Sequence, residues 1–344
     1  MSSANSIGYF LIFDWRNRMK TAISNNTQHA CQSSVDQWAE EIRPYYKNGQ
    51  NAGYIPALGK VNSSQLGISV IGPDGSSVRY GDWDVPFTLQ SISKVISFIA
   101  ACLGRGVPYV LDRVDVEPTG DAFNSIYRLE MHKPGKPFNP MINAGAITVS
   151  SILPGKTSTE KLAYIFDLIE NLIGKRPSVN EEVYQSEWAT AHRNRALAYY
   201  LKETNYLESD VEDTLEVYLK QCSIEVTTED IALIGLIISS DGYHPFKQVQ
   251  VIPKDIARLT KALMLTCGMY NASGNFAAFV GVPAKSGVSG GIMACVPPSA
   301  RREFPFQTGC GIGIYGPAID DCGNSITGVM MLKKLAKEWD LSIF

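Results

Sequence analysis

The 344-residue sequence has few histidines and no paired-cysteine motif. Its four histidines lie far apart, without the spacing of metal ligands, so no metal site is predicted. Seven scattered cysteines, mostly inside apolar runs, form no Cys-x-x-Cys pair, which favours reduced core residues. The formal charge of −3 gives no reason to expect nucleic acid or an anionic membrane as a partner. The composition therefore favours a small-molecule ligand.

Long apolar runs are also missing. The stretch Ile7–Phe13 has no basic region before it and charged residues after it, so neither a signal peptide nor a membrane span is predicted, and a cytoplasmic location is expected. With 45% hydrophobic residues, a chain of this length can bury a large core. Residues 1–33, with Met19 as an alternative start, are interpreted as an N-terminal extension, and residues 34–344 as a single domain.

Strand patterns occur near both ends of the chain, and helical patterns dominate the middle. A hairpin is predicted around Pro73-Asp74-Gly75, and further strands over Gly291–Pro297 and Thr308–Pro317. Helices are predicted over Ser34–Tyr46, from Ser91 onward, and over Asn143–Leu153, Ser158–Ile173, Ser178–Leu201, Asp210–Cys222, Thr227–Ser240, Pro253–Gly268 and Ser325–Trp339. We expect an α+β fold: an antiparallel sheet lobe (about 34–90 and 271–344) flanked by terminal helices, with a helical lobe (about 91–270) inserted. A ligand is expected in the cleft between the lobes.

The sequence Gly311–Gly316, GIGIYG, matches the GxGxxG pattern of nucleotide-binding loops. Pro317 follows it and no helix begins there, so a strand is predicted instead.

The stretch Thr88–Gly106, TLQSISKVISFIAACLGRG, places Ser91 and Lys94 one turn apart at the start of an apolar helix, on one face. A serine hydroxyl needs a base within reach to act as a nucleophile, and a buried lysine near a helix N-terminus loses its proton more readily. A Ser91 nucleophile with Lys94 as base is one interpretation. A capped structural helix start is the other, and this stretch alone does not separate them.

A second Ser-x-x-Lys, Ser158–Lys161, provides an internal comparison. Thr157 and Glu160 fit a capping box there, and Lys161 is expected on the polar side of an amphipathic helix. A structural role is predicted for this copy.

The stretch Val282–Ile292, VPAKSGVSGGI, favours the catalytic interpretation of Ser91. Its Lys285-Ser286-Gly287 is similar to the Lys-Ser/Thr-Gly strand of enzymes that use a Ser-x-x-Lys nucleophile. The backbone N–H groups of Ser91 and Val288 are candidate oxyanion donors. A glycine-rich structural turn is the alternative for this stretch taken alone.

Together these motifs resemble the serine-dependent glutaminases of the β-lactamase and penicillin-binding-protein superfamily. The resemblance runs from about Gly53 to Gly328, through GYIPAL, FTLQSISKV, EPTGDAFNS, PFNPMINAGAI, SEWATAHRN, QCSIEVTTED, CGMYNASGNFA, PAKSGVSGGI and DCGNSITG. It implies a β-lactamase/transpeptidase-like fold and hydrolysis of L-glutamine to L-glutamate and ammonia through a Ser91 acyl-enzyme, without a cofactor. It also implies a homodimer or homotetramer.

The resemblance assigns individual roles: Ser91 as nucleophile, Lys94 as its general base and Tyr270 in proton transfer. The residues implied to bind glutamine are Tyr54, Gln90, Ser91, Asn143, Glu187, Asn194, Tyr218, Tyr270 and Val288. The chemistry agrees, because an amino-acid head group needs a fixed anion together with neutral donors. Glu187 and Asn194, seven residues apart, are predicted on one face of a single helix.

The sequence departs from the family pattern at a few positions. Asn271 stands where aspartate is common, Ser289 where glycine is usual, and Ala191-His192 where Gly-x is common. None of these changes removes a chemical group assigned above. Two alternatives stay open: a penicillin-recognising serine hydrolase, which would need export, and a non-catalytic glutamine-binding domain of the same fold.

Overall fold

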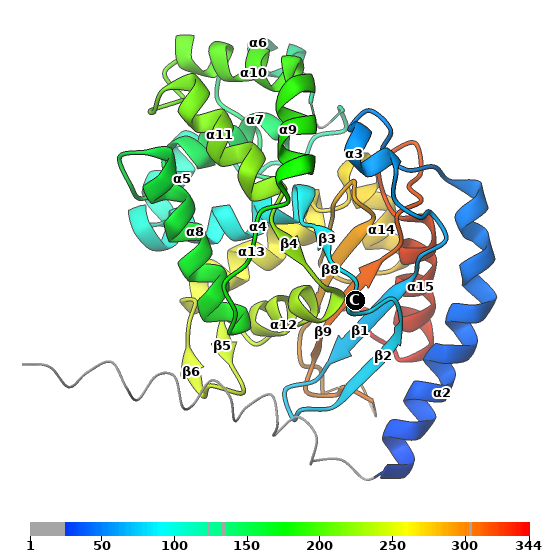
Figure 1. The fold of residues 1–344 in the computed structure, drawn as a ribbon. Helices are drawn as coiled ribbons and strands as arrows, with labels where there is room; N and C mark the ends of the chain where they lie inside the picture. The colour runs from blue at the N-terminus through cyan, green and yellow to red at the C-terminus, as the bar shows by residue number, and fades with distance from the viewer. Residues whose placement is uncertain (1–24, 123, 132–134, 301, 303–304) are drawn as a thin grey trace, which may run out of the picture.

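A five-stranded antiparallel sheet forms the centre of the computed structural model (Figure 1), which describes residues 25–344 apart from 123, 132–134, 301 and 303–304. The strand order is β2-β1-β9-β8-β7. The bounds are β1 Gly67–Ile71, β2 Ser77–Gly81, β7 Ala284–Ser286, β8 Gly291–Val296 and β9 Cys310–Tyr315. Ile68 of β1 lies opposite Ile314 of β9, so the two ends of the chain meet within the sheet, as predicted.

One face of the sheet is covered by helices α2 (Asn25–Ile42) and α15 (Ile326–Glu338) (Figure 1). Alternate strand residues such as Ile312 and Ile314 share a core cluster with both helices. Burial of this apolar surface is the main force that holds the layers together.

Helix α2 begins at Asn25, earlier than the predicted start at Ser34. The sequence before Ser34 is polar and gives no helical periodicity, but Gln28 and Gln32 donate hydrogen bonds to the carbonyl groups of Ser77 and Arg79 on the edge strand β2. Tertiary contact therefore extends the helix. Residues 1–24 of the predicted extension lie outside the described residues.

The opposite face of the sheet is covered by α12 (Thr228–Ser239), which begins with a capping box made by Thr227 and Asp230. This helix approaches the strands so closely that only glycine fits at the contact. A Cβ atom on Gly311 would lie 1.8 Å from the Ala232 oxygen, and one on Gly235 would lie 2.4 Å from the Ala294 oxygen. The GIGIYG stretch is thus a strand, as predicted, and the absence of side chains at Gly311 and Gly313 allows the close approach of α12.

Several of the remaining helices pack against α4 (Ser93–Arg105), which is buried from Ser93 to Cys102. Long helices follow their predicted spans closely: α7 Asn143–Ser151, α8 Ser158–Ile173, α11 Val211–Cys222 and α13 Lys254–Cys267. The sequence did not predict the short helices α3 Pro56–Gly59, α5 Val107–Arg113, α6 Tyr127–Met131 and α14 Ser273–Phe279, because a few residues show no clear period. Two-residue strands pair as β3 Phe87–Thr88 with β4 Glu225–Val226, and as β5 Tyr243–His244 with β6 Val249–Gln250.

The helix predicted over Ser178–Leu201 is wrong in one respect, because it is two helices, α9 (Glu181–Thr190) and α10 (His192–Glu203). No proline or glycine marks the break at Ala191. Arg195 stabilises the break between the two helices. Its guanidinium group donates a hydrogen bond to the Trp188 carbonyl group at 3.0 Å and stacks over the Trp188 ring. Glu187 and Asn194 therefore do not share one helix face.

The prediction for Lys161 is also wrong. Thr157 caps α8 as expected, but Lys161 is only 4% exposed. Its ammonium donates to the Ser151 carbonyl oxygen and to the Ser209 hydroxyl group, which offsets the cost of burial. The role of this second Ser-x-x-Lys is structural, as predicted, but its lysine lies in the protein interior and not on the polar side of the helix.

The seven cysteines are all free, and five of them are buried: Cys31, Cys102, Cys222, Cys295 and Cys310. Cys267 is partly buried and Cys322 is exposed, so the prediction of core cysteines fails for these two. Among the described residues, no helix combines the length and apolarity needed to cross a membrane.

We expect Gly311→Ala to lower the free energy of unfolding by about 3 kcal/mol, because the new methyl group overlaps backbone that cannot move independently of the sheet. Urea unfolding measures this change. Gly274→Ala is the matched control, since a Cβ atom there meets nothing within 4 Å. Equal stability of the two variants would contradict the close contact between α12 and β9.

Candidate active site

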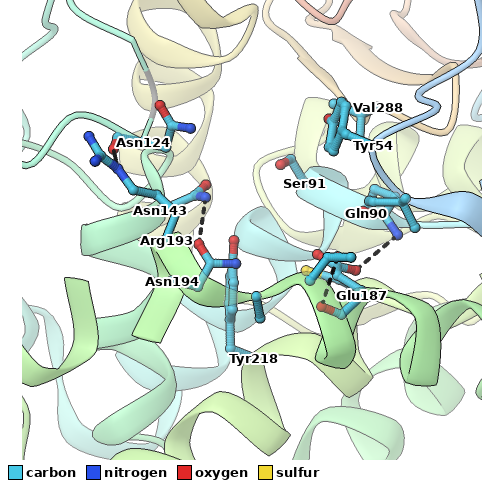
Figure 2. Close-up of a pocket in the computed structure, with 14 residues that line it drawn as sticks. Tyr54, Gln90, Ser91, Asn124, Asn143, Glu187, Arg193, Asn194, Tyr218 and Val288 are labelled. Atoms are coloured by element: carbon cyan, nitrogen blue, oxygen red, sulfur yellow. Dashed lines mark hydrogen bonds between the residues drawn. The ribbon is translucent and has the colours of Figure 1, made fainter. Parts of the chain in front are cut away.

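A cavity of about 270 Å³ opens where the start of α4, the α9–α10 break, α11 and the β7–β8 turn meet (Figure 2). Eight residues predicted to bind substrate line it: Tyr54, Gln90, Ser91, Asn143, Glu187, Asn194, Tyr218 and Val288. Its volume is near the lower end of the range of small-ligand sites, about 300–1,000 Å³. Lys94 and Tyr270, the other two predicted residues, are buried beside it.

Ser91 lies in a tight turn rather than in the α-helix proper. Gln90–Ile92 form a 3₁₀ turn, and α4 begins at Ser93. Gln90 has φ of 47°, a left-handed conformation that is unfavourable for a non-glycine residue. This turn leaves Ser91 partly exposed to the cavity, whereas Lys94 is fully buried.

The Lys94 ammonium donates to Asn143 Oδ1 at 2.7 Å and to the Met141 carbonyl oxygen at 3.2 Å. Burial lowers the pKa of Lys94 to about 8, while Cys222 and Glu187 oppose the shift. The neutral amine has two N–H groups and one lone pair. Because these two acceptors take both N–H groups, the lone pair of the neutral amine is left available to accept a proton.

Lys94 also orients the amide groups of the cavity. Because Lys94 is a donor in both protonation states, Asn143 must present its oxygen to it. The Asn143 amide nitrogen then donates to Asn194 Oδ1 at 3.0 Å (Figure 2). The Asn194 nitrogen is thereby left as a donor, which suits an anionic ligand group.

Glu187 supplies negative charge in the same cavity. Gln90 donates to one of its oxygens at 3.4 Å (Figure 2). Burial raises the pKa of Glu187 to about 7, against the lowering effects of Gln90 and Lys94. With Asn194 and the Tyr218 hydroxyl nearby, the cavity presents one anion and several neutral donors, the set required by an α-amino acid head group.

Tyr270 lies behind Ser91 in a second strained turn, with φ of 52°. Burial raises the pKa of its phenol, while hydrogen bonds with Ser91 and Ser286 act in the opposite direction. The Lys285 ammonium lies 4.3 Å from the centre of the Tyr270 ring. Tyr270 therefore remains a neutral hydroxyl group that is able to pass a proton.

The β7–β8 turn brings a second backbone segment against the nucleophile. A Cβ atom on Gly287 would lie 2.6 Å from the Leu89 oxygen and 3.4 Å from the Ser91 nitrogen. Glycine is needed at this position for so close an approach. This close approach brings the backbone that precedes Val288 beside the N–H group of Ser91. An oxyanion site requires two backbone donors that lie close together in this way.

Comparison with known proteins agrees with this geometry. The glutaminase family model matches residues 49–344. Glutaminase 1 of Bacillus subtilis (strain 168) is 75% identical over 307 residues, 89% of this chain and 94% of that protein. The chain belongs to the glutaminase family. A crystal structure of a Bacillus subtilis probable glutaminase superposes with a TM-score of 0.88 at 70% identity, covering 92% of this chain and 98% of that one.

A further similar structure is the covalent complex between a Bacillus subtilis glutaminase and 5-oxo-L-norleucine, formed by reaction with 6-diazo-5-oxo-L-norleucine. It superposes with a TM-score of 0.83 at 67% identity, and the match covers 91% of this chain and 99% of that one. The predicted family and its β-lactamase-like fold are confirmed.

Several pocket residues were not among those predicted. They are Ile55, Asn124, Thr190, Ala191, Arg193 and Cys222. Three of them carried a usable signal, because Cys222 is one helical turn after Tyr218, and Ile55 and Arg193 are the chain neighbours of Tyr54 and Asn194. The others follow from chain segments that meet only in the folded protein.

Replacing Glu187 with glutamine is expected to stabilise the fold in a pH-dependent way. Because its pKa is raised from 4.5 to about 7 in the native protein, the carboxyl group ionises first in the unfolded chain, and the stability of the native protein falls between about pH 4.5 and pH 7. Glu187→Gln should match the melting temperature of the parent protein near pH 4 and exceed it by a few degrees at about pH 8. Glu182→Gln, on the exposed side of α9, is the control. A difference that does not change with pH would contradict the burial of this charge.

Proposed function

We propose that the protein hydrolyses L-glutamine to L-glutamate and ammonia through an acyl-enzyme on Ser91. The chain of contacts from Lys94 through Asn143 to Asn194 carries this proposal, because it connects the base to the groups that read the substrate. A cavity that contains a nucleophile, a buried lysine and an amino-acid head-group site fits side-chain amide hydrolysis of an amino acid.

The bound substrate is oriented by charge. The α-ammonium group faces Glu187, and the α-carboxylate accepts hydrogen bonds from Asn194 and Tyr218. The side chain then extends toward Ser91, in the part of the cavity that Tyr54 and Val288 also line (Figure 2). The covalent complex of the Bacillus subtilis relative with 5-oxo-L-norleucine supports a linear amino acid as the ligand.

Chemistry begins when Ser91 Oγ attacks the amide carbon and Lys94 accepts the hydroxyl proton. The N–H groups of Ser91 and Val288 stabilise the oxyanion. Ammonia leaves after it receives a proton from Lys94 or Tyr270. Water then attacks the ester while Lys94 accepts its proton, and Lys94 passes that proton to Ser91 Oγ as the ester bond breaks and glutamate is released. Each step uses only groups of this chain, substrate and water.

Two further expectations belong to this proposal. A homodimer or homotetramer is expected from the family resemblance, and light scattering measures the assembly. The cytoplasm is the expected compartment, consistent with the free thiol groups of all seven cysteines.

The first test is release of ammonia and glutamate from purified protein supplied with L-glutamine, with L-asparagine in parallel. Release from glutamine supports the proposal. Glutamine binding without release would instead identify a binding domain. Labelling of Ser91 by a fluorescent penicillin, without glutamine hydrolysis, would identify a penicillin-recognising hydrolase.

The two Ser-x-x-Lys copies serve as mutual controls. Ser91→Ala and Lys94→Met should reduce kcat by at least about 10³-fold while the protein stays folded, because nucleophile and base act as a unit. Ser158→Ala should leave kcat unchanged. Lys161→Met should lower the free energy of unfolding by about 1–3 kcal/mol through lost buried hydrogen bonds, with kcat retained. Retained activity of Ser91→Ala would refute the assignment.

The rate of glutamine hydrolysis should increase as pH rises. Glu187 ionises with a pKa of about 7 and then binds the ammonium group, and Lys94 loses its proton with a pKa of about 8 and then acts as base. We expect kcat/KM for glutamine to increase from about pH 6 to about pH 9. Initial rates at constant ionic strength test this. A profile that falls over this range would exclude Lys94 as the base.

A further inference from the structure

The β7–β8 turn carries one of the two oxyanion donors of the proposed function. Its own hydrogen bonds use the N–H of Gly287, which reaches the Gly291 oxygen, and the N–H of Gly290, which reaches the Gly287 oxygen. The N–H of Val288, at the centre of the turn, is not used by either bond. Its direction depends on how the whole turn is held.

The next residue, Ser289, ties this turn to the segment that leads to the nucleophile. Its hydroxyl group donates to the Thr88 carbonyl oxygen at 2.7 Å, across 201 residues of sequence. Ser289 is only 6% exposed, so the bond is shielded from water. Thr88 ends strand β3, three residues before Ser91. The bond therefore connects the two segments that provide the oxyanion N–H groups.

Two other observations show why such a tie matters. On one side of Val288, Gly287 presses against the Leu89 oxygen, which limits how close the segments come. In the same facing segment, Gln90 holds a left-handed conformation that persists only when its surroundings fix it. The hydrogen bond from Ser289 to Thr88 is an attractive contact next to the point where Gly287 limits the approach of the two segments. The glycine that the family resemblance predicts at this position has no side chain to make the bond.

We propose that Ser289 is a positioning residue that sets the separation of the Ser91 and Val288 N–H groups. The proposal rests on the proposed function, since it requires an oxyanion. Without the hydroxyl group the turn loses its hydrogen bond to the Thr88 segment, and its separation from Ser91 is held less tightly. Transition-state stabilisation then falls, while the ground-state contacts to the amino-acid head group, which lie on other segments, are unaffected.

The test compares Ser289→Ala and Ser289→Thr with the parent protein. For Ser289→Ala we expect kcat for glutamine to fall about tenfold with KM unchanged, less than the 10²–10³-fold cost of removing an oxyanion donor outright. Ser289→Thr should restore kcat. Its hydroxyl group keeps the bond, and its extra methyl group enters a cavity of about 230 Å³ that Ser289 lines with Phe87 and Thr88.

Ser239→Ala is the matched control. The Ser239 hydroxyl is also buried and also donates to a backbone carbonyl, that of Leu236 at 2.8 Å, but within α12. It should change the melting temperature without changing kcat. Urea unfolding of every variant separates loss of fold from loss of rate.

Three outcomes would overturn the role of Ser289: an unchanged kcat in Ser289→Ala, an equal change in KM and kcat, or a folded Ser289→Thr that does not recover. If the parent protein hydrolyses glutamine, each of these three outcomes contradicts the role of Ser289 and not the proposed function. Absence of ammonia release from the parent protein would instead overturn the proposed function itself.

Discussion

The hydrogen bond from Lys94 to Asn143 is the interaction on which the rest of the site depends. A fully buried amine must find acceptors or lose its charge, and here it does both in part, with two acceptors and a pKa near 8. The same bond fixes the Asn143 amide, which fixes Asn194. One lysine, the proposed base, thus joins α4, α7 and α10 and fixes the two amide groups that are proposed to bind the substrate.

The cavity also concentrates features that oppose stability. Gln90 and Tyr270 both have left-handed backbones on either side of Ser91, and Glu187 and Lys94 have pKa values shifted toward their neutral forms. Such strain persists only in a rigid frame. The frame here is the sheet, whose glycine-lined contact with α12 allows the helical and strand segments to meet closely.

Local signals predicted most of the fold, because caps and apolar periods report directly on helix ends. Helices α11 and α12 begin where predicted, with Asp210 and Thr227 as their caps, and α8 has its predicted bounds. The errors at Ala191 and Lys161 share one cause. Each depends on a contact with a distant or folded-back segment, such as Arg195 on Trp188, which periodicity does not encode.

The sequence by itself determined the fold class through apolar patterning, and the family and eight of the cavity residues through motifs that resemble those of the glutaminases. Only the tertiary structure decided how they act together: which atom of Asn143 faces Lys94, how Ser289 reaches Thr88, and why Gly287 and Gly311 must be glycine. These depend on distances between segments remote in sequence. Hydrogen-bond direction and steric contact arise only when those segments pack together.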